Sequence, residues 1–175
     1  GRDEMIRETA RRLDEDQAVV GWFQGRMEWG PRSLGARSIL ADSRNKDNWT
    51  RVNKKIKFRE SFRPFAPAVL LDKASEWFDL DRESPYMLLV CQVKNLIEKE
   101  METPTGVSRR LTSELPSITH VDGSARVQTV TRAQHAEFQH QVEAGDRRRA
   151  RARHGDLHLR QFLADDLESV EQRGG

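Results

Sequence analysis

The chain has 175 residues, of which 36% are hydrophobic, 33% charged and 7% aromatic, a size and composition typical of one folded domain. No run of 18 apolar residues exists and the first twenty residues lack an apolar core, so we expect neither a transmembrane helix nor a secretory signal. A single cysteine, Cys91, excludes an internal disulfide and a cysteine-based zinc site, and we expect a cytoplasmic protein. Because the sequence begins with Gly rather than Met, we also expect it to be a piece of a longer protein.

Helix and strand patterns alternate in the first half of the chain. Residues 3–16 carry apolar side chains at helical spacing and predict a helix. Residues 18–23 are a short apolar run that predicts a strand, and the glycines and proline of residues 25–35 predict a loop. Asp47 is expected to cap a helix with one apolar face, formed by Trp49, Val52 and Ile56.

The middle of the chain predicts further strands. Residues 65–71 form an apolar run entered through prolines and predict a buried strand, followed by a short helix over 73–78. Residues 86–91 give the clearest strand pattern of the chain, and residues 117–121 and 125–130 alternate around a tight turn at 122–124. Strands mixed with helices in this order predict an α/β or α+β domain.

The character of the sequence changes after Val130. Residues 131–175 contain no clear strand pattern, and in residues 146–153 Asp146 is followed by arginines separated only by alanines. We therefore expect a folded domain over residues 1–140 and a divergent, Arg-rich tail over residues 141–175, either disordered or frameshifted.

The net charge of +2 conceals a strongly basic region. Residues 26–63 contain eleven Lys or Arg residues and four Asp or Glu residues, a local balance of +7, interleaved with aromatic residues and glycines. This mixture favours a folded site for an anion, because arginine binds phosphate oxygens in a bidentate fork and glycine lets the backbone approach closely.

Three segments carry the candidate chemistry. Residues 25–38 form a Gly-rich loop with Arg32 and Arg37, and Trp29 beside a loop glycine is expected to line the pocket. Residues 53–67 place Lys57 and Arg63 before an apolar strand, and residues 119–128 place His120, Asp122 and Arg126 around one turn. For each segment alone, an ordinary turn or helix end with surface charges stays open as the alternative.

Together, residues 22–42, 56–67 and 120–130 resemble the C-terminal region of the ATP-dependent O-carbamoyltransferases, a family that acts in nodulation and in antibiotic biosynthesis. The resemblance extends over roughly residues 5–135. It implies a YrdC-like α/β (α+β) domain, a twisted open sheet with flanking helices, here incomplete at its C-terminus. In that family such a domain converts carbamoyl phosphate and ATP to carbamoyl-adenylate, releasing pyrophosphate. A Kae1-like N-terminal domain with bound iron, absent here, transfers the carbamoyl group to a hydroxyl of a small molecule.

The resemblance also implies site residues. The catalytic cations of the family fall on Arg32, Lys57 and Arg63, and Mg²⁺ is expected with ATP, although no metal ligand is assigned in this chain. Residues expected to bind ATP or carbamoyl phosphate are Gly30, Arg32, Arg37, Lys57, Arg63, His120 and Arg126. Fixed cations at these positions offset the repulsion between two polyanions and stabilise the departing pyrophosphate.

The sequence departs from the family after Val130. Family members continue with a helix and an apolar strand leading into an Asn-Thr-Ser-Phe-Asn segment, which this chain lacks. A frameshift after about residue 140 would leave the pocket without a wall. An inactive truncated remnant is therefore one alternative, and a YrdC-like module that binds nucleic acid through residues 26–63 is a second, less favoured one. We expect no membrane partner.

Overall fold

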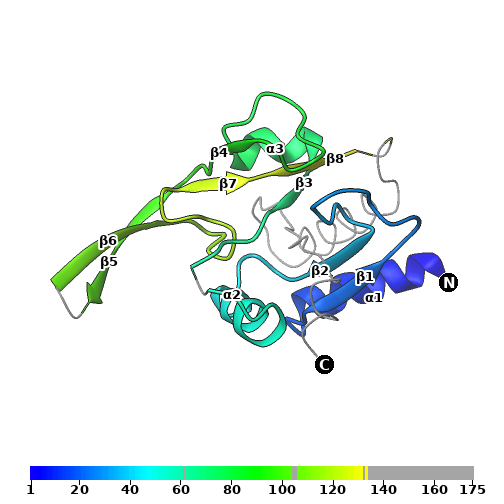
Figure 1. Ribbon diagram of the computed structural model, residues 1–175, viewed down its shortest axis with the longest axis horizontal. Helices are drawn as coiled ribbons and strands as arrows, with labels where there is room; N and C mark the ends of the chain where they lie inside the picture. The colour runs from blue at the N-terminus through cyan, green and yellow to red at the C-terminus, as the bar shows by residue number, and fades with distance from the viewer. Residues whose placement is uncertain (61, 104–105, 132, 134–175) are drawn as a thin grey trace.

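The computed structural model describes residues 1–60, 62–103, 106–131 and 133 (Figure 1). Within these residues the chain forms three α-helices, one π-helix and eight strands, and the strands join in four two-stranded sheets. The predicted mixed α/β class is confirmed. The predicted domain boundary at residue 140 and the tail over residues 141–175 lie outside the described residues.

Helix α1 and a hairpin-like strand pair form the N-terminal part of the fold (Figure 1). Helix α1 spans Arg2–Asp14, which confirms the helix predicted over 3–16. Strands β1 (Val20–Phe23) and β2 (Arg37–Leu40) pair antiparallel, with Val20 opposite Leu40 and Phe23 opposite Arg37. The 13 residues between them contain no helix or strand, as predicted, and the strand pairing holds the two ends of this loop together.

A helix with two kinds of turn follows. Helix α2 spans Lys46–Arg51 and continues directly into the π-helix η1, Val52–Ile56. The prediction that Asp47 caps this helix is wrong. The cap is Asn45, whose side chain accepts a hydrogen bond from the N–H of Asp47 at 2.9 Å, and Asp47 lies in the first turn, where a carboxylate favours the helix dipole. The predicted apolar face does pack against the core.

Two strands far apart in the sequence form a parallel pair. Strand β3 spans Ala68–Leu70, shorter than the strand predicted over 65–71, and helix α3 (Leu71–Trp77) begins directly after it. Strand β8 (Gln128–Val130) runs parallel to β3, with Ala68 opposite Gln128. One buried cluster joins α1, β1, β2, β3 and β8 through Ile6, Leu13, Trp22, Leu40, Ala68 and Val130.

Strands β4 (Val90–Gln92) and β7 (Ser124–Arg126) pair antiparallel, with Cys91 opposite Ala125. The strand predicted over residues 86–91 is wrong for its first four residues, because Met87 has a left-handed φ of 53° that interrupts the extended backbone. Tyr86 and Leu88 are exposed there, while Met87 is buried.

The turn predicted at residues 122–124 is confirmed, but the strand predicted over residues 117–121 is wrong. The N–H of Gly123 donates to the carbonyl of His120 at 2.9 Å, and the N–H of His120 donates to the carbonyl of Ser124 at 2.9 Å. Residues 117–121 adopt turns and irregular backbone instead. The backbone of Ser117 bonds to Ser43 and Phe65, two loop residues, rather than to a neighbouring strand.

An unpredicted hairpin extends away from the body of the molecule (Figure 1). Strands β5 (Ile97–Thr103) and β6 (Gly106–Thr112) pair antiparallel over their full length, from Ile97 opposite Thr112 to Thr103 opposite Gly106. The guanidinium of Arg110 lies 4.5 Å from the ring centroid of Trp49, a cation–π contact that links the hairpin to α2.

Candidate functional site

The Gly-rich loop is closed by the carboxylate of Glu28. One oxygen of Glu28 accepts hydrogen bonds from the backbone N–H groups of Leu34 and Ala36, at 2.8 and 2.5 Å, and the N–H of Gly35 donates to the hydroxyl of Ser38 at 3.1 Å. The N–H groups of three successive residues are therefore used inside the loop. An anion at this loop must be bound by side chains rather than by these N–H groups, in contrast to the expectation from the glycines.

The two candidate arginines of the loop, Arg32 and Arg37, have different surroundings. Arg37 donates to the carbonyls of Gln24, Gly25 and Ala36 at 2.8–3.2 Å, and its guanidinium lies 5.2 Å from the ring centroid of Phe23. Arg32 is half-buried and makes no hydrogen bond or ion pair with another described residue. Arg37 thus supports the loop from within. Arg26 is exposed at the start of the loop, and Arg32 is the half-buried arginine here that is available to a ligand.

Gly30 occupies a backbone conformation that requires glycine. Its φ is 135°, and a side chain added there would meet open space, with no atom within 4 Å. The glycine is therefore needed for its backbone conformation rather than for a close contact. Gly30 lies two residues before Arg32, so its backbone conformation affects the path of the loop that carries Arg32.

The second segment is organised around a buried amide. Asn53 is fully buried; its Nδ2 donates to the carbonyl of Arg63 at 3.0 Å, and its Oδ1 accepts from the Nε of Arg59 at 2.7 Å. The indole of Trp49 donates to the same Arg63 carbonyl at 2.8 Å. Lys57 ends the π-helix, with its N–H bonded to the carbonyl of Val52 at 2.8 Å, and is half-buried.

The side chain of Arg63 lies on the surface. Its Nε is 3.0 Å from the carboxylate of Glu60, and both side chains are more than half exposed. An ion pair of this kind contributes about 0–1 kcal/mol, so an incoming phosphate displaces Glu60 at little cost. The backbone carbonyl of Arg63 is fixed by Asn53 and Trp49. A fixed backbone and a displaceable partner suit a residue that contacts a ligand.

The third segment is a turn centred on Asp122. One carboxylate oxygen accepts from the hydroxyl of Ser124 at 2.6 Å and from its N–H at 2.9 Å, and lies 2.9 Å from the Nδ1 of His120. These contacts, the Ser124 hydroxyl first, lower the pKa of Asp122 from 3.8 to about 2. His120 therefore belongs to the turn in this structure, and Arg126 follows half-buried in β7.

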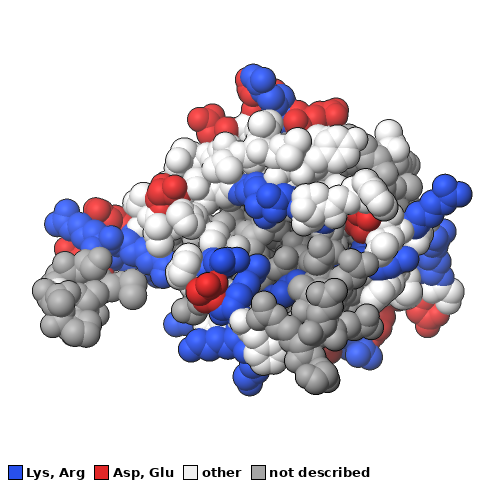
Figure 2. Space-filling view, viewed as in Figure 1, with Lys and Arg blue, Asp and Glu red and all other residues white. Residues whose placement is uncertain are grey.

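Direct contacts bring the three segments together. The side-chain amide of Gln128 donates to the carbonyl of Leu34 at 2.8 Å, and its backbone N–H donates to the carbonyl of Pro67 at 2.8 Å. Leu34, Ala66 and Met87 share one apolar cluster. Figure 2 shows Lys and Arg side chains gathered in the middle and lower part of one face, below a band with few charges.

Three positioning residues were missed in the sequence. Glu28, Asn53 and Gln128 each lie inside a segment selected for its cations, and each bonds to backbone groups of that segment or the next. Their residue types could have indicated these roles, because a carboxylate or amide that is buried among glycines and aromatic residues needs a hydrogen-bond partner.

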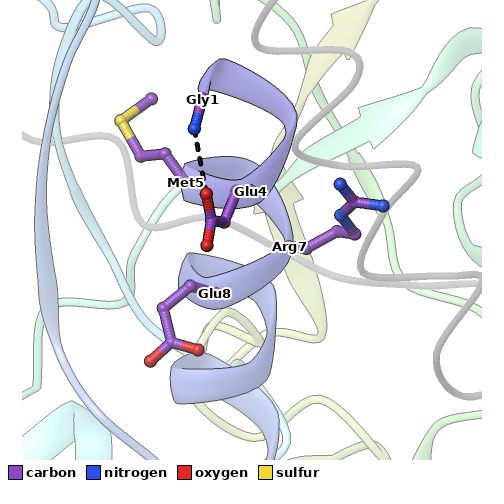
Figure 3. A pocket seen from close by; sticks show the side chains of 5 residues that line it. All are labelled: Gly1, Glu4, Met5, Arg7 and Glu8. Carbon is purple, nitrogen blue, oxygen red and sulfur yellow. Dashed lines mark hydrogen bonds and ion pairs between the residues drawn. The ribbon is translucent and has the colours of Figure 1, made fainter.

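Other features of the described residues lie apart from these segments. No group of three His, Cys, Asp or Glu residues there is arranged to hold a metal ion. A pocket runs along α1 and is lined by Gly1, Glu4, Met5, Arg7 and Glu8, with the terminal amine 2.9 Å from the carboxylate of Glu4 (Figure 3). None of these five residues belongs to the three segments. Among the described residues, no helix is long and apolar enough to cross a membrane.

The fold and the site define a mixed α/β domain that carries arginine and lysine on three interlocked segments. A family model described as "Carbamoyltransferase C-terminus" matches residues 10–151, and the chain belongs to this family. The family predicted from the sequence is confirmed.

Curated relatives agree with this assignment. An uncharacterized protein of Synechocystis is 54% identical over 118 residues, which are 64% of this chain and 19% of that protein. The nodulation protein NolO of Bradyrhizobium diazoefficiens is 49% identical over 118 residues, 66% of this chain and 19% of that protein. A 3'-hydroxymethylcephem-O-carbamoyltransferase of Amycolatopsis lactamdurans is 39% identical over 130 residues, 70% of this chain and 22% of that protein. The chain thus spans about a fifth of the length of these relatives.

Proposed function

We propose that this chain is the carbamoyl-activating part of an O-carbamoyltransferase. The observation that carries the proposal is Arg32, half-buried in a loop whose backbone N–H groups are bound by Glu28 and Ser38, and without a partner among the described residues. A half-buried guanidinium without a partner in that part of the chain is free to bind phosphate oxygens in a bidentate fork. The family and the name of the cephem carbamoyltransferase support the carbamoyl group as the one activated.

The proposed reaction consumes ATP and carbamoyl phosphate. Water cleaves carbamoyl phosphate to carbamate and phosphate, and a carbamate oxygen then forms a bond to the α-phosphorus of ATP. The bond between that phosphorus and the β-phosphate bridge breaks, and its electrons leave with pyrophosphate. Both steps concentrate negative charge, so the protein contributes mainly positioned cations, with Mg²⁺ accompanying ATP.

Each cation has a proposed task. Arg32, Lys57, Arg63 and Arg126 contact the phosphates, because they lie on the three segments that Gln128 and the Leu34 cluster bring together. Gly30 and Arg37 shape the loop that carries Arg32, and His120 belongs to the turn that precedes Arg126. We propose that a Kae1-like N-terminal part with iron then passes the carbamoyl group to a hydroxyl of a small molecule in the cytoplasm.

Exchange of labelled pyrophosphate into ATP in the presence of carbamoyl phosphate tests the proposal. Arg32→Ala and Lys57→Ala are expected to lower the exchange rate by about 10²-fold or more, the usual cost of removing one group that stabilises a charged transition state. Arg82→Ala is the matched control, because Arg82 is an exposed arginine paired with Asp81 outside the three segments. Wild-type exchange in both variants would overturn the site, and a folded wild-type chain without exchange would support the inactive remnant.

A further inference from the structure

Exposed aromatic side chains are concentrated in the basic part of the chain. Trp29, Phe58 and Phe62 are 103%, 64% and 62% exposed, and all three lie among the Lys and Arg residues of the first two segments. The nearby Phe65 is only 3% exposed and is covered by the guanidinium of Arg59, 4.9 Å from its ring centroid. An exposed ring in a basic part of the chain offers an apolar face to a ligand that combines a flat ring with phosphates.

Phe58 is the most constrained of the three. Its φ is 49°, a left-handed conformation that non-glycine residues rarely adopt and that costs about 1–2 kcal/mol. Hydrogen bonds on both sides hold it there: the N–H of Lys57 bonds to the carbonyl of Val52, and the N–H of Arg59 bonds to the carbonyl of Asn53 at 3.0 Å. The Oδ1 atom of Asn53 also accepts a hydrogen bond from the Nε of Arg59, at 2.7 Å.

This arrangement leaves the aromatic ring of Phe58 exposed to solvent. Lys57 precedes Phe58 in the sequence and Arg59 follows it, and the ring does not join the apolar cluster that contains Val52 and Ile56 of the preceding helix. Backbone strain that the surrounding hydrogen bonds maintain is characteristic of residues that contact ligands. An exposed flat ring one residue after the lysine proposed to bind phosphate suits a nucleobase whose phosphates lie alongside.

We propose that Phe58 is the stacking platform for the base of the nucleotide bound at this site. The proposal rests on the proposed function, since it takes the phosphates of the same nucleotide to be held by Lys57 and its partner cations. Stacking on a phenyl ring is tolerant of base identity, because every base has a π-face. The platform therefore contributes affinity for nucleotides over inorganic polyphosphates more than it selects adenine.

Isothermal titration calorimetry with two ligands separates the ring from the cations. ATP carries a base and three phosphates, whereas inorganic tripolyphosphate carries phosphates only. Phe58→Ala is expected to weaken ATP binding by about 5- to 150-fold, the loss of one base–aromatic stack, and to leave tripolyphosphate binding unchanged. Phe58→Trp is expected to retain ATP binding. Tyr86→Ala is the matched control, an exposed aromatic residue outside the basic segments, and is expected to change neither.

Several results would overturn the inference. Equal loss of ATP and tripolyphosphate affinity in Phe58→Ala would show that the change acts on the phosphate site rather than on a stack, and unchanged ATP affinity would remove the platform. Loss of binding to a single-stranded RNA 12-mer with ATP unaffected would assign the ring to a different ligand. A wild-type chain that binds neither ATP nor tripolyphosphate overturns the proposed function as well, whereas tripolyphosphate binding without preference for ATP overturns the platform alone.

Discussion

The side-chain amide of Gln128 donates a 2.8 Å hydrogen bond to the backbone carbonyl of Leu34, 94 residues earlier in the chain. Gln128 is 1% exposed, so this bond forms away from water and fixes the Gly-rich loop to strand β8. It is the contact on which the joining of the first and third segments depends most directly.

Removing this amide is expected to loosen the loop. Gln128→Ala leaves the Leu34 carbonyl without its donor and opens a cavity, and we expect the free energy of unfolding to fall by about 1–3 kcal/mol. Gln128→Leu fills the space and should recover only the part of the lost free energy of unfolding that comes from packing. Urea denaturation measures both, with the exposed Gln92→Ala as the control. Equal stability of Gln128→Ala and the wild type would contradict the proposed role.

The carboxylate of Glu28 is expected to protect two amides from hydrogen exchange. In Glu28→Ala the N–H groups of Leu34 and Ala36 lose charge-assisted bonds, and we expect their exchange to speed up by about 10- to 100-fold. Amide exchange followed by NMR gives the rates residue by residue. Glu114→Ala, which replaces an exposed glutamate, should leave both amides unchanged. Protection that persists in Glu28→Ala would assign the loop geometry to the glycines alone.

Replacing Phe58 by glycine is expected to stabilise the chain while weakening nucleotide binding. Glycine adopts a φ of 49° without strain, so Phe58→Gly should raise the free energy of unfolding by about 1 kcal/mol. Phe62→Gly is the matched control, since Phe62 is equally exposed but has no left-handed φ, and it should be neutral or destabilising. Thermal denaturation without ATP measures the change in stability, and the shift in melting temperature on adding ATP measures the change in nucleotide binding. A fall in stability for Phe58→Gly would show that the ring itself holds the fold.

Acid is expected to remove the contribution of Asp122 to stability. Its pKa is about 2 in the folded chain and 3.8 in an ordinary aspartate, so the carboxylate stabilises the fold above pH 4 and loses this effect as the pH falls through 2. Asp122→Asn should therefore be less stable than the wild type at pH 7 and equally stable near pH 2. Urea denaturation across this range tests it, with Asp79→Asn as the control, because Asp79 is exposed and lies outside any helix. A stability difference that does not depend on pH would rule out the charge as its cause.

The thiol of Cys91 is expected to be slow to react. Burial, with a smaller effect of the Asp79 carboxylate, raises its pKa from 9.0 to about 11, which lowers the thiolate fraction at neutral pH by about 100-fold. Ellman's reagent should therefore react much more slowly with the folded chain than with the unfolded chain. Guanidinium chloride at about 6 M, which unfolds domains of ordinary stability, gives the unfolded reference. Similar rates in the two states would show that Cys91 is open to solvent.

The sequence predicted the local elements best where one signal dominated. Helix α1 and strand β1 followed their apolar spacing, and the turn before β7 followed its Asp-Gly-Ser residues. The helix cap was misplaced by two residues because Asn45 and Asp47 are both good caps, and only the hydrogen bond to the Asp47 N–H distinguishes them.

Tertiary context decided the elements that were wrong or missed. Residues 86–89 carry strand-forming side chains, yet the left-handed φ of Met87 breaks the strand. Strand β5 is rich in Glu and strand β6 carries two arginines, residues with low strand propensity. Cross-strand pairs such as Glu100 with Arg109, 3.5 Å apart, connect the two strands.

The candidate site was predictable as a set of cations but not in its division of tasks. Arg32 and Arg37 look alike in the sequence, and only the structure shows that the Arg37 guanidinium donates hydrogen bonds to three backbone carbonyls of the loop region. The roles of Glu28, Asn53 and Gln128 were equally hidden, because the backbone groups they bind are identical in every residue of a sequence.

The parallel pairing of β3 with β8 has a consequence for the order of events during synthesis. Ala68 meets Gln128, a residue made 60 positions later, and the same residue fixes the Gly-rich loop. Closing so long a loop is entropically costly, and it is repaid only when both strands are present. The Gly-rich loop therefore gains its bond to Gln128 only after residue 130 has left the ribosome, whereas its apolar contact with Ala66 and Met87 can form earlier.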